Sequence, residues 1–322
     1  MGTRRNISTN VAARDAFIQG VLALKAENSG FDTAQLQFIL HPSGVQTQQL
    51  STWDLFTLWH AMAMNERQGS GRNAAHSGPT FLPWHRWFLL LLEWQFQRVL
   101  GAQNFGLPYW DWAADGDQPV PQQRQQPLWT AQWIGGDGAG SSNSVTSGPF
   151  RVGNGFRVHI EGDNQGRIWA TNRALQRTLG RGVADLPTTA QVSAVLNQAN
   201  YDEPTWNAFS ADGLRNRLEG WAPRPTMPHL HNRVHVWMGG DMGPATSPND
   251  PVFFLNHCNV DRIWAGWQAR PGPRPYVPTT GSAAELFRHR RNDPLYSVLT
   301  SFEPRINQVL NVTQFYDYDV LP

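Results

Sequence analysis

The 322-residue chain has little capacity for covalent cross-links and lacks long apolar segments. Cys258 is its only cysteine, so no disulfide can form within the chain. The apolar run from Phe88 to Leu92 is bounded by Arg86 and Glu93. It is far shorter than the roughly 20 residues that an α-helix needs to cross a bilayer. We therefore expect neither a disulfide framework nor attachment to a membrane.

Lysine is almost absent, because Lys25 is the only one and arginine carries the remaining positive charge. The formal net charge is +1 with both signs interspersed, which gives no reason to expect binding to nucleic acid. Residues 1–6 lead into a polar segment instead of an apolar run, so we predict no signal peptide. These features indicate a cytoplasmic protein, or one exported with a helper protein, that acts on a small molecule.

Histidine is the residue whose placement is most informative, because six of the ten histidines fall into two blocks of three. The blocks are His60, His76 and His85, and His231, His235 and His257. His231 and His235 are four residues apart, so on a helix they share one face. Imidazole suits zinc, copper, iron or nickel, and no carboxylate or thiolate recurs at matching spacing. The pattern predicts metal binding but does not by itself separate copper from zinc.

Local signals predict the elements that carry these histidines. A helix is expected over residues 10–28 with Asn10 as its cap, and another is expected to begin at Ser51–Thr52 and to carry His60. Residues 68–79 are rich in Gly, Ser and Asn and predict a loop that delivers His76. A long apolar helix is expected over Pro83–Leu100, with His85 in its first turn, and a further helix over Val252–Trp267.

The remaining chain predicts mostly irregular structure. Residues 113–170 are polar and rich in proline and glycine, which favours loops with short strands near Phe156–Ile160. A short helix is expected after Thr188–Thr189, and the alternation in residues 310–319 is typical of a short strand. A linker between two domains is the alternative for residues 113–170. It would require the two histidine blocks to meet at a domain interface.

Several segments around the histidines closely resemble the type 3 copper family, and within it the bacterial tyrosinases. The segments are Pro83–Arg86, Pro108–Trp112, Arg215–Trp221, Leu230–His235, Pro248–His257 and Val260–Trp264. The resemblance implies a mainly α fold with long loops and a few short strands. It further implies one catalytic domain over residues 1–322, with a central four-helix bundle that holds a dinuclear copper site.

The resemblance also implies the chemistry. His60, His76 and His85 would hold the first copper ion, and His231, His235 and His257 the second. Two metal ions about 3.5–4 Å apart can act together on one substrate, and zinc lacks the redox chemistry that copper supplies. The implied reaction uses dioxygen to hydroxylate monophenols and to oxidise o-diphenols to o-quinones, the chemistry of melanin formation. A helper protein for copper delivery is a further expectation.

Two other activities stay open at this stage. One is an o-diphenol or o-aminophenol oxidase without useful monophenol hydroxylation, and the other is a hemocyanin-like oxygen carrier. The choice between the two oxidases depends on Glu219 and Asn232. These match the glutamate and asparagine that hold a water molecule in tyrosinases, and this water would deprotonate a phenol whose ordinary pKa is near 10. The alternative for Glu219 is an ion pair with Arg215 or Arg217 on a helix surface.

Three further residues are expected near the site. Ala245 matches a gate position beside the second copper ion, and its small side chain would leave the entrance open. Phe253 would face the substrate pocket, with burial in the core as the alternative. Asp261 lies one helical turn after His257, where it would accept a hydrogen bond from a metal-binding imidazole or lie on the helix surface. The segment Ala222–His229 departs from the family pattern and puts the position of Glu219 in question.

Overall fold

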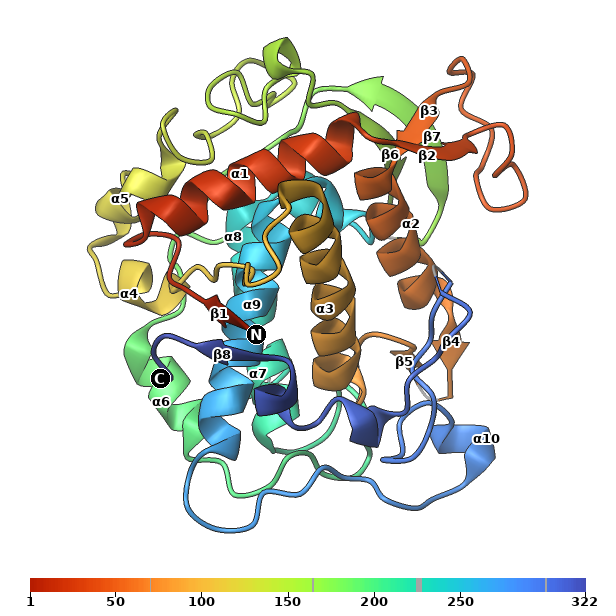
Figure 1. The fold of residues 1–322 in the computed structure, drawn as a ribbon. Helices are drawn as coiled ribbons and strands as arrows, with labels where there is room; N and C mark the ends of the chain where they lie inside the picture. The colour runs from red at the N-terminus through yellow and green to blue at the C-terminus, as the bar shows by residue number, and fades with distance from the viewer. Residues whose placement is uncertain (70, 164, 224–227, 299) are drawn as a thin grey trace.

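The computed structural model describes residues 1–322 except 70, 164, 224–227 and 299. The fold is mainly helical, as predicted, and five helices form its body (Figure 1). They are α1 (Val11–Ala26), α2 (Thr52–Asn65), α3 (Phe81–Leu100), α8 (Leu230–Met238) and α9 (Val252–Gln268). The last four form the central bundle, and Figure 1 shows α1 lying across the ends of α2 and α3.

Shorter elements surround this bundle. The short helices are α4 (Trp112–Gly116), α5 (Val120–Gln123), α6 (Thr189–Leu196), α7 (Leu214–Glu219) and α10 (Ala283–Leu286). The strands are β1 (Gly2–Arg4), β2 (Asn28–Asp32), β3 (Gln49–Ser51), β4 (Arg67–Gln68), β5 (Arg72–Asn73), β6 (Val158–Gly162), β7 (Ile168–Arg173) and β8 (Tyr316–Tyr318). Long connections join these elements. The predicted helix after Thr188 corresponds to α6, and the predicted strands near residues 156–160 and 310–319 correspond to β6 and β8, so these predictions are confirmed.

The helix starts follow from capping side chains. Asn10 accepts a hydrogen bond from the backbone N–H of Ala13 and begins α1. Ser51 and Asp54 form a reciprocal capping box at the start of α2, at 3.1 and 2.9 Å. These two predictions are confirmed.

The start of α3 differs from the prediction by two residues. The helix begins at Phe81, so His85 lies in its second turn and not its first. The prediction placed Pro83 at the boundary. However, proline is tolerated anywhere in a first turn, where its missing N–H would have no helical partner. Gly101 ends the helix in the left-handed conformation, with φ of 62°.

The strands pair into four small two-stranded sheets. In the first, β1 pairs in parallel with β8, with Gly2 opposite Tyr316, so the two ends of the chain lie side by side (Figure 1). The antiparallel pairs are β2 with β3, β4 with β5, and β6 with β7. None of these sheets forms a layer of its own, and the core lies between helices.

Aromatic side chains fill the core of the bundle. One apolar cluster contains buried residues from Ile7 to Tyr316, and one of its tryptophans, Trp84, packs beside His60 and His85. The ring of Trp84, for example, lies 5.5 Å from that of Trp59 and stacks on Phe88 at 4.9 Å. Tryptophan is large and rigid, which suits it to holding neighbouring side chains in fixed positions. The tryptophans therefore serve as core residues in this packing.

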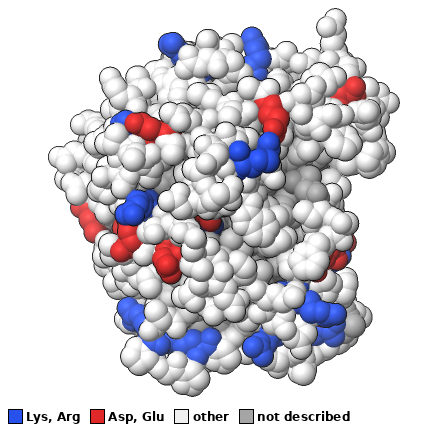
Figure 2. All heavy atoms as spheres, viewed as in Figure 1, with Lys and Arg blue, Asp and Glu red and all other residues white. Residues whose placement is uncertain are grey.

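The surface carries charges of both signs. On the face shown in Figure 2, acidic and basic side chains are scattered over a mostly uncharged surface. Among the helices of the described residues, none combines the length and apolar character needed to cross a membrane.

Candidate metal centre

The six histidines of the two blocks converge on one place inside the bundle. His60 comes from α2, His85 from α3, His231 and His235 from α8, His257 from α9, and His76 from the loop between β5 and α3. Within each triplet, one ring nitrogen of each residue lies within 4.8 Å of the others. The rings of His85 and His257 stack at 4.1 Å, so the two triplets are adjacent. The loop position predicted for His76 is also found.

Backbone carbonyls fix the orientation of several imidazoles. The Nδ1 atom of His60 lies 2.7 Å from the carbonyl oxygen of Ala245, and that of His235 lies 2.7 Å from the carbonyl of Met242. His85 makes the same contact, at 2.8 Å, with a carbonyl one turn earlier in α3. A neutral imidazole that donates through Nδ1 carries its lone pair on Nε2. These rings therefore present Nε2 as a ligand atom.

The Nε2 atoms have the environment of a metal site. Those of His60 and His85 are buried and have no hydrogen-bond partner among the described residues. In the second triplet, Nε2 of His231 lies 3.0 Å from that of His235 and 3.1 Å from that of His257. Lone pairs that face one another at this distance are stabilised by a cation between them. The all-imidazole donor set fits copper.

Burial keeps these histidines neutral, as metal binding requires. Desolvation lowers the pKa of His60 to about 3 and that of His235 to about 4. Desolvation also lowers the pKa of the other four histidines, and the neighbouring imidazoles add to the shift. Proton competition for the ligand nitrogens is therefore weak at neutral pH.

Glu219 lies at the C-terminal end of α7, fully buried beside this centre. Its carboxylate accepts a hydrogen bond of 2.6 Å from the backbone N–H of Ser77 and one of 3.0 Å from Arg215. The ion pair with Arg215 considered above exists, but both side chains are buried, so its expected place on the helix surface is wrong. Burial raises the pKa of Glu219 even though Arg215 opposes the shift.

Asn232 follows the first histidine of α8 and lies at the edge of the centre. Its side-chain oxygen lies 3.0 Å from Nδ1 of His231. The backbone carbonyl of Glu219 lies 3.2 Å from the same nitrogen. His231 therefore connects the two residues that the resemblance paired.

The altered segment before α8 begins and ends close to the C-terminal end of α7. Gly220 ends α7 in the left-handed region, with φ of 106°, and its carbonyl accepts a hydrogen bond from the N–H of His229 at 3.2 Å. The segment between Gly220 and His229 therefore leaves the end of α7 and returns to it at Gly220. Ala222, Pro223 and Pro228 belong to this excursion, whereas residues 224–227 lie outside the described residues.

A cavity of about 400 Å³ opens over the histidines. Four of them line it: His60, His76, His231 and His235. Asn232 and Ser77 are also in its wall, together with the larger apolar side chains Met64, Trp221 and Val236. Glu219 is not part of this wall, although Ser77, which it binds, is.

Ala245 and Phe253 differ from their predicted positions. The side chain of Ala245 packs in a small apolar cluster, while its neighbours Gly243 and Pro244 line the cavity. Ala245 contributes the backbone carbonyl that orients His60. Any residue type would supply this carbonyl, so the sequence does not mark it. The ring of Phe253 is fully buried, 4.2 Å from that of His257, so it supports the imidazoles from the core and does not face the cavity.

Asp261 matches neither of its predicted roles. It is buried, and it accepts hydrogen bonds from Arg86 at 2.6 Å and from the hydroxyls of Tyr316 and Tyr318 at 2.5 and 2.6 Å. Nδ1 of His257 has no partner among the described residues. Asp261 lies one helical turn after His257 on the same side of α9, but its carboxylate is engaged by Arg86 and by the two tyrosines near the C-terminus.

The sequence also gave no sign of the ion-pair network behind Glu219. Arg215 binds both oxygens of Asp202, at 2.8 and 2.9 Å, as well as Glu219. The acidic and basic residues are visible in the sequence. Only the fold shows that they are buried together.

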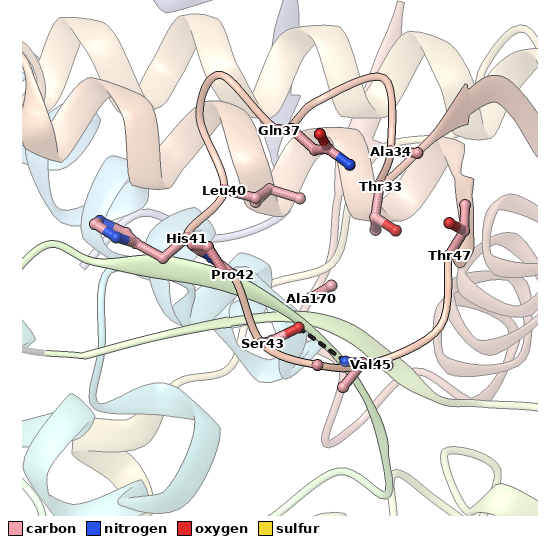
Figure 3. Close-up of a pocket in the computed structure, with 11 residues that line it drawn as sticks. Thr33, Ala34, Gln37, Leu40, His41, Pro42, Ser43, Val45, Thr47 and Ala170 are labelled. Atoms are coloured by element: carbon pink, nitrogen blue, oxygen red, sulfur yellow. Dashed lines mark hydrogen bonds between the residues drawn. The ribbon is translucent and has the colours of Figure 1, made fainter.

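A second hollow, of about 410 Å³, lies under the loop of residues 33–47 (Figure 3). Uncharged polar side chains line it, including Thr33, Gln37, Ser43 and Thr47, and Ala170 lies on its floor. None of the predicted site residues is in its wall. The histidine cavity is therefore the site that the geometry favours.

Comparison with known proteins agrees with this geometry. Residues 50–270 match the family model for the common central domain of tyrosinase. The chain is 43% identical to a tyrosinase of Streptomyces galbus over 256 residues, which cover 79% of this chain and 83% of that protein. It is 38% identical to grixazone synthase of Streptomyces griseus over 270 residues, which cover 78% and 83%.

The fold is also that of a solved relative. A polyphenol oxidase from Thermothelomyces thermophila superposes with a TM-score of 0.73 at 23% identity, over 99% of this chain and 88% of that one. Residues 50–270, which match the family model, include both histidine triplets, and the family binds a copper pair. The chain belongs to the tyrosinase family of type 3 copper proteins, whose members carry out copper-dependent oxidation of phenols.

Proposed function

We propose that this protein uses dioxygen to hydroxylate monophenols at the ortho position and to oxidise o-diphenols to o-quinones. The observation that carries the proposal is the convergence of two imidazole triplets beneath one open cavity. His60, His76 and His85 would hold the first copper ion, and His231, His235 and His257 the second. When bound, the copper pair supplies the two-electron redox chemistry that the side chains lack.

The cavity supports small phenols as the substrates. Its volume of about 400 Å³ lies in the range of small-molecule sites, about 300–1,000 Å³. Met64, Trp221 and Val236 supply apolar and aromatic surface for a phenol ring. The histidines in the wall lie where the ring hydroxyl would enter. The chain thus binds and orients the substrate before any electron moves.

Glu219 and Asn232 are the proposed base and its partner. Burial raises the pKa of Glu219 above that of an ordinary carboxyl group, which brings it closer to the working pH of a general base. Ser77, Arg215 and Trp221 donate to a carboxylate that offers about four lone-pair sites, so one site remains for a water molecule. A water molecule held by Glu219 and Asn232 would take the phenol proton.

One observation favours the second oxidase activity. Glu219 does not line the cavity, and each of its oxygens already accepts a hydrogen bond. An o-diphenol or o-aminophenol oxidase needs this base less, because catechols are more acidic than phenols and can chelate metals. Relatives at similar identity carry the names tyrosinase and grixazone synthase, so identity alone does not choose between the two activities.

Turnover of copper-loaded protein tests the proposal. We expect a monophenol and a catechol both to be converted repeatedly to coloured quinone with consumption of dioxygen. Activity on the catechol alone would establish the second oxidase activity. Reversible oxygen binding without oxidation of a catechol would establish the carrier and overturn the proposal.

We also propose that residues 1–322 form one catalytic domain. Support comes from the main apolar cluster, whose buried residues run from Ile7 to Tyr316 and include both histidine-bearing halves. Copper delivery by a helper protein stays a prediction.

A further inference from the structure

Glu219 contacts the supports of both histidine triplets. Its carboxylate accepts the N–H of Ser77 at 2.6 Å, and Ser77 directly follows His76 of the first triplet. Its backbone carbonyl lies 3.2 Å from Nδ1 of His231 in the second triplet. Ser77 and Glu219 are 142 residues apart in the chain. The contact therefore joins two segments that nothing in the local sequence connects.

The loop around His76 depends on such contacts. Among the six histidines, His76 is the one that no helix carries. Ser77 has φ of 58°, in the left-handed region that residues other than glycine rarely occupy. Backbone strain of this kind persists only where surrounding contacts hold the conformation.

Besides the hydrogen bond from Tyr201 to Pro79 and the backbone hydrogen bonds of the loop, three side chains contact the loop close to His76. The side-chain oxygen of Asn73 accepts the N–H groups of Ala75 and His76, at 3.0 and 2.7 Å. A Cβ atom on Gly78 would lie 2.7 Å from the ring of His289, so this side chain packs directly on the loop. Glu219 provides the only charged acceptor of the three, and it is itself fixed by Arg215.

We propose that Glu219 is a positioning residue for the first metal site, because its carboxylate holds the loop that carries His76. This role is additional to that of the proposed base and rests on the proposed function only through the six metal-binding histidines. If the acceptor is lost, the partly buried N–H of Ser77 has no partner, and the loop moves to hydrate it. His76 then leaves the position in which it faces His60 and His85.

The Gln and Ala variants separate the two roles. Glu219→Gln removes the charge and the basicity but keeps an oxygen that can accept the N–H of Ser77. Glu219→Ala removes both. A backbone ester in place of the His76–Ser77 peptide bond removes the N–H of Ser77 and leaves Glu219 intact as a base, while the His76 carbonyl stays as a weaker acceptor for the N–H of Asn73.

Anaerobic titration with Cu(I) against a chromophoric competitor provides the readout. A His235→Ala background leaves only the first triplet complete, and a His60→Ala background leaves only the second. At the first triplet we expect Glu219→Ala and the ester to weaken Cu(I) binding about tenfold or more, and Glu219→Gln to stay within about threefold of the parent. At the second triplet the ester should have no effect.

The ester decides the outcome if Glu219→Ala does not fold. Unchanged Cu(I) binding by the ester at the first triplet would overturn the positioning role, as would equal weakening at both triplets. If only the base role is wrong, the result differs. The ester still weakens Cu(I) binding at the first triplet, but Glu219→Gln leaves monophenol hydroxylation unchanged.

Discussion

The imidazole rings of His85 and His257 lie parallel, with centroids 4.1 Å apart and an angle of 11° between their planes. One ring comes from each triplet, on helices α3 and α9. The two proposed metal sites therefore share a wall of stacked imidazoles. Movement of either helix changes both sites together.

We predict that copper-loaded protein contains about two copper ions per chain, as in other two-metal sites. His85→Ala and His257→Ala should each reduce the content to about one or below. His41→Ala is the matched control, because His41 is exposed and belongs to neither triplet, and it should keep the parent stoichiometry. Elemental analysis measures this. A single ion in the parent protein, or a preference for zinc, would contradict the prediction.

We predict that Glu219→Gln reduces monophenol hydroxylation at least about tenfold while catechol oxidation changes little, because general bases contribute on the order of 10²–10⁴-fold. Asn232→Ala should affect the same step. Glu203→Gln, at a partly exposed position outside the site, serves as the control. Steady-state rates with a matched monophenol and catechol provide the test. Equal losses on both substrates would remove Glu219 from the proton transfer.

The metal-free protein should lose stability as the pH falls below about 6.5, the ordinary pKa of histidine. The folded state keeps His60 and His235 neutral down to pKa values of about 3 and 4, whereas the unfolded chain takes up protons sooner. The unfolded state then binds more protons, so the free energy of unfolding decreases by up to about 1.4 kcal/mol per pH unit for each histidine.

Urea unfolding of the metal-free protein between pH 7.5 and roughly 4.5 measures this slope. His235→Leu should flatten it, and His41→Ala should leave it unchanged. A pH-independent midpoint in the parent protein would show that the histidines are hydrated in the absence of metal.

Lys25→Met should destabilise the protein by about 3 kcal/mol, because it removes the cationic partner of the buried Asp54 carboxylate and leaves it with Ser51 and His159 alone. Lys25 forms an ion pair with Asp54, and both side chains are almost fully buried. Arg98→Met is the matched control. It breaks an exposed pair with Glu27 and should cost less than about 1 kcal/mol. Chemical unfolding compares the two, and recovery in a Lys25→Met/Asp54→Asn variant would identify the unpaired carboxylate as the cause.

The sequence predicts those features that depend on neighbouring residues. The cap at Asn10, the helix start at Ser51 and the shared helical face of His231 and His235 all arise within four residues. Even so, the start of α3 is displaced, because proline permits several positions in a first turn. Helices are therefore predicted well, and their boundaries less well.

Features formed by distant residues were missed or placed wrongly. Asp261 binds Tyr316 and Tyr318 across 55 and 57 residues, and no local pattern marks this. The loop backbone directs the side chain of Ala245 into an apolar cluster and its carbonyl toward His60, so the predicted gate position beside the second copper ion is not found. Arg215 was considered as a partner of Glu219, but the burial of the pair and the contacts with Ser77 and Asp202 were missed for the same reason. Composition shows which charges exist and does not show which ones the fold buries together.

The pairing of β1 with β8 has a consequence for biosynthesis. Arg4 and Tyr318 are in contact although they are 314 positions apart, and both bind Asp261 on the helix that carries His257. At translation rates of roughly 5–20 residues per second, the first strand waits about 15–60 s for its partner. On the ribosome, α9 thus lacks the tyrosines that fix its carboxylate until the final residues emerge. The second triplet therefore gains its complete support only after residues 316–318 have left the ribosome.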